Sequence, residues 1–201
     1  ATSKKTGRAF VRTLYSAVPG SAKDQPKAVY RALKWIQAIL TKPVPRVETV
    51  SYSKKHILLP DGYWDMEQAE GGCGAILLLH GKEPKSWGEM VPEHLVFQLL
   101  RMQEQAKLKK QRNTQAELLA ILISIVVWNQ ELQGSSLLIL TDSDPALQNV
   151  LKGTAGDEQS QEIVSTIWFL AMCFRIEIWL DWVPSKQNPG DPYSRPKSDQ
   201  E

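Results

Sequence analysis

The sequence predicts an α/β domain, a mixed five-stranded sheet flanked by helices, over residues 51–196. Short apolar runs bounded by turn residues alternate there with longer apolar stretches at helical spacing. The first predicted strands follow one another through short connections, as antiparallel neighbours do. The later strands are separated by helix-length segments, which is typical of parallel strands joined by crossovers.

The composition is that of a folded chain without a global charge signal. Its 201 residues suffice for one sizeable domain plus an appendage, and 42% of them are hydrophobic. The net charge of +2 does not mark a nucleic-acid binder. Any surface that binds nucleic acid must therefore be local.

Residues 1–50 differ in character from the rest of the chain. Apolar residues recur at helical spacing in residues 8–18 and 28–40, and prolines follow the second stretch. We expect a helical lead-in that connects to a preceding domain, and a polar tail at residues 197–201. Because the first residue is Ala1 instead of methionine, we also expect a fragment or processed piece of a longer polypeptide.

Three strands are predicted in the first half of the domain. Residues 56–59 are apolar and meet Pro60-Asp61-Gly62, which predicts a strand that ends at a turn. Residues 74–80 form a continuous apolar run, consistent with a strand buried on both faces. Residues 63–72 connect these strands as an acidic hairpin segment, and residues 86–89 are the third, short strand.

Two helices are predicted next. Residues 92–105 have helical spacing and lead into a basic, polar stretch at residues 107–112. Residues 115–128 form the best-marked helix, because Thr114 and Glu117 have the spacing of a capping box. The body of this helix is apolar nearly all round, so we expect it to be buried.

The second half of the domain continues with a strand, two helices and a strand. Residues 137–140 are an apolar strand, and Ser143-Asp144-Pro145 begins a helix that Gly153 ends. Residues 163–174 form a further apolar helix. Residues 174–183 alternate apolar and polar positions, which is the pattern of a half-buried strand. A polar, proline-rich segment follows.

Four acidic residues stand at the ends of these elements: Asp61, Glu117, Asp142 and Asp191. Taken singly, each has a structural explanation, as a turn residue, a capping-box partner, a helix cap or a loop acid. Taken together, carboxylates at element ends can converge on one edge of a sheet. Such a cluster repels itself unless divalent cations bind there, and oxygen ligands suit Mg²⁺ or Mn²⁺.

Four sequence blocks occur in order along residues 51–196. They are DG at 61–62 with GCGA at 72–75, QAELLA at 115–120, LTDS at 140–143, and WVPSKQNPGD at 182–191 followed by SR at 194–195. Together they resemble the ribonuclease H domain of retrotransposon (reverse transcriptase) polyproteins, and the last block is the most specific. Residues 1–50 also look like the connection that follows a retroelement reverse transcriptase.

The resemblance implies a ribonuclease H-like fold and a metal-dependent endonuclease. This enzyme would hydrolyse the RNA strand of RNA–DNA hybrids as part of a retroelement polyprotein. The resemblance also implies two ions, Mg²⁺ or Mn²⁺, that serve both ends of an in-line displacement. Asp61 would bridge both ions, Asp191 would hold the ion that activates water, and Glu117 with Asp142 would hold the other.

Several alternatives stay open. Asp65 or Glu67 could be the first carboxylate, although Asp61 directly follows the apolar strand. Lys186 and Gln187 occupy the loop where some relatives carry a histidine, so no proton shuttle is assigned. The domain could instead be a catalytically inactive ribonuclease H-like module that binds nucleic acid or docks a partner, or a related DNA nuclease or integrase.

Two groups of residues are candidates for contact with nucleic acid. Basic residues before the Glu117 helix could face phosphates: Lys107, Lys109, Lys110 and Arg112. Polar residues could reach a minor groove, where a 2′-hydroxyl distinguishes RNA from DNA: Asn113, Gln115, Ser143 and Asn188. The expected partners are an RNA–DNA hybrid and an upstream reverse transcriptase domain.

Cysteine usage and hydropathy bear on the compartment. Cys73 and Cys173 lie inside apolar runs, so we expect buried thiols of a reducing compartment and an intracellular location, cytoplasmic or nuclear. The longest apolar stretch, residues 118–128, is too short to span a bilayer, and no signal peptide is visible. We expect no membrane partner.

Overall fold

The structure is a computed structural model that describes residues 55–65, 70–92 and 109–195, together with single helical positions between Tyr30 and Thr41. The polar tail and nearly all of the helix predicted at residues 92–105 lie outside the described residues, as does most of the predicted lead-in.

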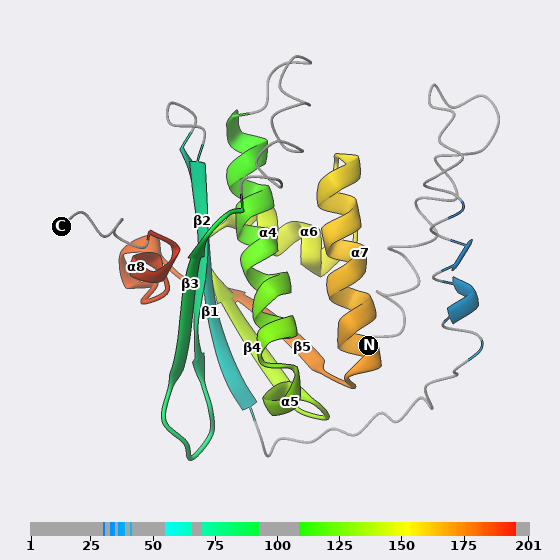
Figure 1. The fold of residues 1–201 in the computed structure, drawn as a ribbon, viewed down its shortest axis with the longest axis horizontal. Coiled ribbons are helices and arrows are strands. Elements are labelled where there is room, and N and C mark those ends of the chain that lie inside the picture. The colour runs from blue at the N-terminus through cyan, green and yellow to red at the C-terminus, as the bar shows by residue number, and fades with distance from the viewer. Residues whose placement is uncertain are drawn as a thin grey trace.

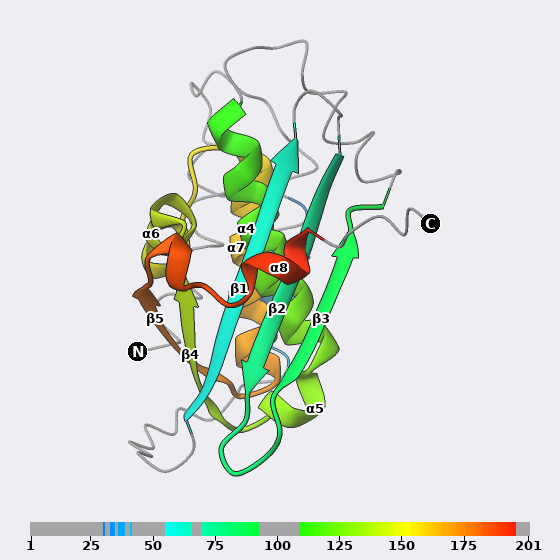
Figure 2. The same cartoon turned by 90° about the vertical axis from the view of Figure 1, so that its left-hand side faces the viewer.

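Five strands form one mixed sheet (Figure 1). They are β1 Lys55–Asp65, β2 Glu70–Leu78, β3 Lys85–Met90, β4 Ser136–Thr141 and β5 Glu177–Trp182. Their order across the sheet is β3-β2-β1-β4-β5, as Figure 2 shows face-on. β1, β2 and β3 are antiparallel neighbours, whereas β1, β4 and β5 run parallel. The predicted mixed sheet is confirmed.

Strand β1 is longer than predicted and passes through Pro60-Asp61-Gly62. The prediction of a turn there is wrong, because Asp61 pairs with Gly74 inside the β1–β2 ladder. The pairing of β1 with β4 covers only residues 55–58. Pro60 therefore follows the end of the β4 pairing, and a strand tolerates a missing N–H donor where it lacks a neighbour. Asp61 consequently lies within a strand instead of on a turn.

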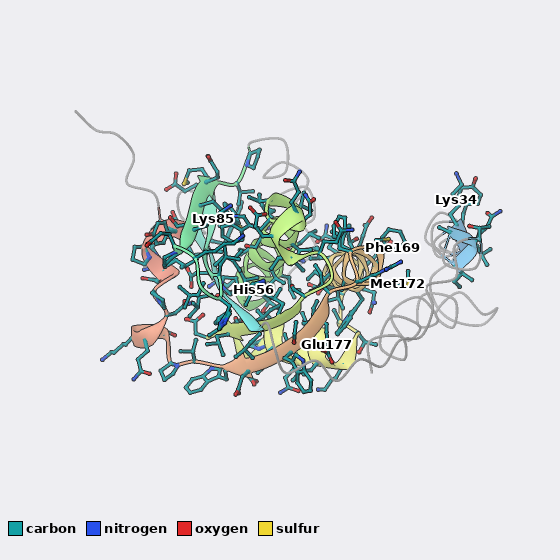
Figure 3. The ribbon with its side chains drawn as sticks, turned by 90° about the horizontal axis from the view of Figure 1, so that it is seen from below. Lys34, His56, Lys85, Phe169, Met172 and Glu177 are labelled. Carbon is teal, nitrogen blue, oxygen red and sulfur yellow. The ribbon has the colours of Figure 1, made fainter. Side chains whose placement is uncertain are left out.

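The described helices lie on both faces of the sheet. They are α4 Lys109–Val127, α5 Asn129–Leu132, α6 Asp144–Lys152, α7 Glu158–Cys173, the 3₁₀ turn η2 Ser185–Gln187 and α8 Asp191–Ser194. Figure 1 shows α4, α6 and α7 on one side of the sheet and α8 on the other. Figure 3 shows side chains filling the space between the sheet and helices α4 and α7. The core lies there and includes Leu58, Leu77, Leu118, Ile139 and Trp168.

Helix α4 begins at Lys109, earlier than the predicted start at Gln115. Thr114 lies inside the helix, so the predicted capping box with Glu117 is wrong. Residues 109–112 of the basic stretch belong to the helix because lysine, glutamine and arginine are good helix formers and no glycine or proline interrupts them. The prediction that the helix is buried is confirmed for most of its body, although Val126 and Val127 are exposed.

Helix α6 has the predicted caps. The Ser143 hydroxyl accepts a hydrogen bond from the Ala146 N–H at 3.4 Å, and Gly153 adopts a left-handed φ of 67°. Helix α7 begins before the predicted residue 163, because the Asp157 side chain caps it by accepting the Ser160 N–H at 2.8 Å. A local hydrogen bond thus sets the start of α7.

The two cysteines differ in exposure. Cys73 is buried on β2, its thiol donates to the Ala116 carbonyl at 3.4 Å, and burial raises the pKa of Cys73 to about 12. Cys173 is the last residue of α7 and is exposed, so the prediction of a buried thiol is wrong there. None of the helices in the described ranges combines the length and apolar character needed to cross a membrane.

Candidate metal centre

Three carboxylates meet where β1, β4 and α4 come together. Asp61 lies on β1, Asp142 directly follows β4, and Glu117 lies on α4. One ligand oxygen from each residue lies within 4.8 Å of the others. Parallel β1 and β4 are neighbours, so the carboxyl end of β4 delivers Asp142 beside mid-strand Asp61. Residues far apart in the sequence therefore form one acidic cluster.

Gly62 allows helix α4 to approach the strand closely enough to place Glu117 in this cluster. A Cβ atom at Gly62 would lie 2.4 Å from the carbonyl carbon and oxygen of Ala116 and 2.7 Å from the nitrogen of Glu117. No real side chain fits at such distances, so any other residue would push the helix and the strand apart.

Burial and like charge act together on these carboxyl groups. Burial raises the pKa of Glu117 well above its usual value, and the charges of Asp61 and Asp142 raise it further. The Gly62 N–H, which donates to Glu117, acts against this rise. Burial likewise raises the pKa of Asp61, and a hydrogen bond from Ser194 opposes that shift.

One oxygen of Glu117 has no partner within the described part of the chain. The side chain is only 8% exposed, and its Oε2 atom makes no hydrogen bond there. A buried carboxylate oxygen without a partner is costly, and a cation would satisfy it. The donor set consists of carboxylate oxygens, which suit a hard divalent cation such as Mg²⁺ or Mn²⁺. These residues therefore fit a metal ion.

Asp191 lies near the cluster without belonging to the closest group. It is the first residue of α8, and its Oδ1 pairs with Arg195 Nη2 at 2.9 Å. Its charge raises the pKa of both Asp61 and Glu117, which reflects its proximity to them. The structure thus brings three of the four predicted carboxylates into contact range and leaves the fourth beside them.

Asn188 links the acidic residues to the segment after β5. The side chain is buried, and its Nδ2 donates to the Pro60 carbonyl at 3.1 Å. The same nitrogen lies 3.5 Å from Asp61 Oδ1 and 3.4 Å from Asp142 Oδ1. Its Oδ1 accepts the Gly190 N–H at 3.0 Å. These contacts keep the amide within the protein and do not support the predicted reach into a minor groove.

Ser194 was not among the predicted site residues, although the SR pair that contains it was noted. Its side chain is fully buried, and its hydroxyl donates to Asp61 Oδ2. The contact joins residues separated by 133 positions. No local sequence signal could have identified it.

Helix α8, which carries Ser194, packs against glycine residues of strands β2 and β3. A Cβ atom at Gly74 would lie 2.4 Å from the carbonyl carbon of Tyr193, and one at Gly88 would lie 2.1 Å from its carbonyl oxygen. These glycines leave room for the α8 backbone to lie against β2 and β3. In the sequence, Gly74 was noted as part of the GCGA block and Gly88 lies in the predicted strand at residues 86–89.

The four basic residues predicted to contact phosphate differ in where they lie. Lys107 lies outside the described residues, and Lys109 and Lys110 belong to the first turn of α4. Arg112 is only 3% exposed, and its guanidinium lies 5.6 Å from the centre of the Trp64 ring. A buried guanidinium stacked on an indole does not support contact with phosphate.

The remaining polar candidates also have protein partners. Asn113 is exposed, but its Oδ1 accepts the Trp64 N–H at 3.2 Å. Gln115 is buried and donates to Asp157 Oδ1 at 3.0 Å. Ser143 caps α6 beside Asp142 and is partly exposed. Ser143 and Asn113 are thus the members of this group whose side chains reach the surface.

The first carboxylate was predicted with two alternatives. Asp65 pairs with Glu70 at the far end of the β1–β2 ladder and is not a member of the carboxylate group. Glu67 lies outside the described residues. Among the described candidates, the geometry favours Asp61.

Comparison with known protein families and with curated proteins finds no match. Among solved structures, the N-terminal RNase H domain of Rv2228c from Mycobacterium tuberculosis, solved as a fusion with maltose-binding protein, has a TM-score of 0.51. It is 17% identical in sequence, and the match covers 71% of this chain and 92% of that one. RNase H1 from the archaeon Halobacterium salinarum has a TM-score of 0.50 and 12% identity, over 70% of this chain and 95% of that one. The sheet order, the flanking helices and these likenesses together show that the chain has the ribonuclease H fold.

Proposed function

We propose that this protein is a divalent-metal-dependent endonuclease that hydrolyses the RNA strand of RNA–DNA hybrids. One observation carries the proposal: Glu117, whose buried Oε2 makes no hydrogen bond within the described part of the chain, belongs to a carboxylate cluster with Asp61 and Asp142. The ribonuclease H fold supports it, and the three clustered carboxylates fall in the first three of the four sequence blocks that resemble ribonuclease H domains. A purely structural role would not explain three carboxylates, two of them buried, gathered within 4.8 Å of one another.

In this proposal, Asp61, Glu117, Asp142 and Asp191 would hold Mg²⁺ or Mn²⁺, two ions in all. The ions would activate water and stabilise the leaving 3′-oxygen of the phosphodiester. Ser194 and Asn188 hold the Asp61 carboxylate through hydrogen bonds. Asp191 would turn from Arg195 toward the shared site, because a cation attracts a carboxylate more strongly than a half-exposed guanidinium does.

The retroelement context is part of the same proposal. The WVPSKQNPGD…SR block supports it, since Asn188 and Ser194 contact the carboxylate cluster and the charge of Asp191 acts on it. The upstream partner would be a reverse transcriptase domain that produces the hybrid. Lys109, Lys110, Asn113 and Ser143 are the candidates of this chain for contact with the hybrid.

A gel assay with a labelled RNA strand tests the function. We expect Mg²⁺- or Mn²⁺-dependent cleavage of RNA paired with DNA, no cleavage of duplex DNA, and loss of activity with chelator. Equal cleavage of duplex DNA would instead identify a DNA nuclease of the same fold. Binding of the hybrid without any cleavage, at millimolar Mg²⁺ or Mn²⁺, would identify an inactive binding module.

A further inference from the structure

Ser194 has a fully buried hydroxyl group whose one charged partner is the Asp61 carboxylate. Its side chain is 0% exposed, and it donates to Asp61 Oδ2. The Ser194 Oγ atom also lies 3.0 Å from the carbonyl oxygen of Asp191, the residue that begins α8. The hydroxyl therefore joins the strand that carries one carboxylate to the helix that carries another.

The backbone holds Ser194 in place independently of its hydroxyl. A Cβ atom at Gly72 would lie 1.8 Å from the Ser194 carbonyl oxygen, and one at Gly74 would lie 2.7 Å from its nitrogen. The main chain of α8 thus rests directly on strand β2. Backbone packing of α8 against β2 therefore sets the position from which the Ser194 hydroxyl contacts Asp61.

The contact also orients the Asp61 carboxylate. Oδ2 accepts the Ser194 hydroxyl, while Oδ1 lies 3.5 Å from the amide nitrogen of Asn188. Partners on both oxygens oppose rotation of the carboxylate. Groups that orient a metal ligand through a hydrogen bond commonly change metal affinity by roughly 10–100-fold when they are removed.

We infer that Ser194 is a positioning residue, which fixes the Asp61 carboxylate in the orientation that binds the divalent cation. This inference rests on the metal binding of the proposed function, and it assigns to α8 a role beyond the supply of Asp191. Ser194 touches neither substrate nor cation; it acts through Asp61.

Isothermal titration of the 201-residue chain with Mn²⁺ alone, without nucleic acid, tests this inference. We expect Ser194→Ala to weaken Mn²⁺ binding about tenfold or more. Ser194→Cys keeps the shape but donates weakly, so we expect a similar loss. Ser136→Ala is the matched control: its hydroxyl is buried, has no hydrogen-bond partner among the described residues, and lies at the start of β4, at the other end of the strand from Asp142.

Each outcome decides the inference. Wild-type affinity in Ser194→Ala overturns it, and so does normal binding by Ser194→Cys beside weak binding by Ser194→Ala, because packing would then be the cause. If Ser194→Ala does not fold, the cysteine variant decides alone. If the wild type binds Mn²⁺ but cleaves no hybrid, the proposed enzymatic function fails, whereas the variants still decide the role of Ser194. Absence of Mn²⁺ binding in the wild type overturns both.

Discussion

The carboxylate of Glu117 accepts a hydrogen bond from the backbone N–H of Gly62, the residue after Asp61 in strand β1. The absence of a side chain at Gly62 is also what lets α4 lie so close to this strand. The dipeptide Asp61-Gly62 thus supplies one carboxylate and, through Gly62, allows α4 to bring Glu117 into a buried position next to it. The two carboxylates share a buried place in which neither is well solvated.

This arrangement predicts that the protein without metal is less stable at neutral pH than in weak acid. The folded-state pKa of Glu117 is raised above its usual value of 4.5, so its contribution to stability is present below that value. The contribution is lost as the pH rises through the folded-state pKa. We expect the melting temperature in chelator to fall between about pH 5 and pH 8, and thermal unfolding monitored by circular dichroism measures it.

Two additions sharpen the pH experiment. Glu117→Gln cannot ionise, so the fall should shrink in this variant; the remainder reflects Asp61, whose pKa is raised in the same direction. With saturating Mg²⁺, the melting temperature should instead rise with pH over this range, because cations bind ionised carboxylates. A melting temperature in chelator that rises steadily from pH 5 to pH 8 would contradict the proposed burial of repelling charges.

Asp142→Asn removes a proposed metal ligand while relieving repulsion among the carboxylates. We expect hybrid cleavage to fall by more than the roughly 100-fold that a group outside the ligand set can cost. The melting temperature without metal should stay the same or rise, because Asp142 repels both Asp61 and Glu117. Single-turnover cleavage and thermal unfolding measure the two effects. Retained cleavage would exclude Asp142 from the ligand set.

Local signals in the sequence predicted the elements whose causes are local. Ser143 and Gly153 mark the ends of α6, and both caps form as expected. The turn predicted at Pro60-Asp61-Gly62 fails for a reason that is not local. Its residues favour turns, but pairing with β2 continues through them, and Gly62 is needed for contact with α4.

The site also combines features that local sequence signals predict with features that depend on contacts between distant residues. Acidic residues at element ends indicated which carboxylates could converge, and three of them do. The partners that hold them could not be predicted, because Ser194 and Asn188 meet Asp61 across 133 and 127 positions of sequence. Asn188 and Arg112 look like surface residues in the sequence, yet both are buried by elements distant from them in the chain.

Gly88→Ala should disturb the site from strand β3, two strands away from Asp61 in the sheet. The added Cβ would lie 2.1 Å from the Tyr193 carbonyl oxygen, so α8 must shift and take Asp191 and Ser194 with it. We expect a loss of about 1–3 kcal/mol in the free energy of unfolding, together with weaker Mn²⁺ binding and slower cleavage. Urea unfolding and Mn²⁺ titration measure these effects.

Gly156→Ala is the matched control for this substitution. A Cβ atom there would meet no other atom within 4 Å, so neither stability nor Mn²⁺ affinity should change appreciably. If Gly88→Ala binds Mn²⁺ and cleaves as the wild type does, the close seating of α8 does not matter to the site.

Arg112→Gln separates a structural role from a role in binding phosphate. The guanidinium is buried over the Trp64 ring, so we expect the free energy of unfolding to fall by about 1–2 kcal/mol. A phosphate contact would instead contribute about 0.9 to the slope of log affinity against log salt concentration. Hybrid binding to a catalytically inactive Asp142→Asn background, measured across salt concentrations, should show an unchanged slope. A slope reduced by about one contact would restore Arg112 as a phosphate ligand.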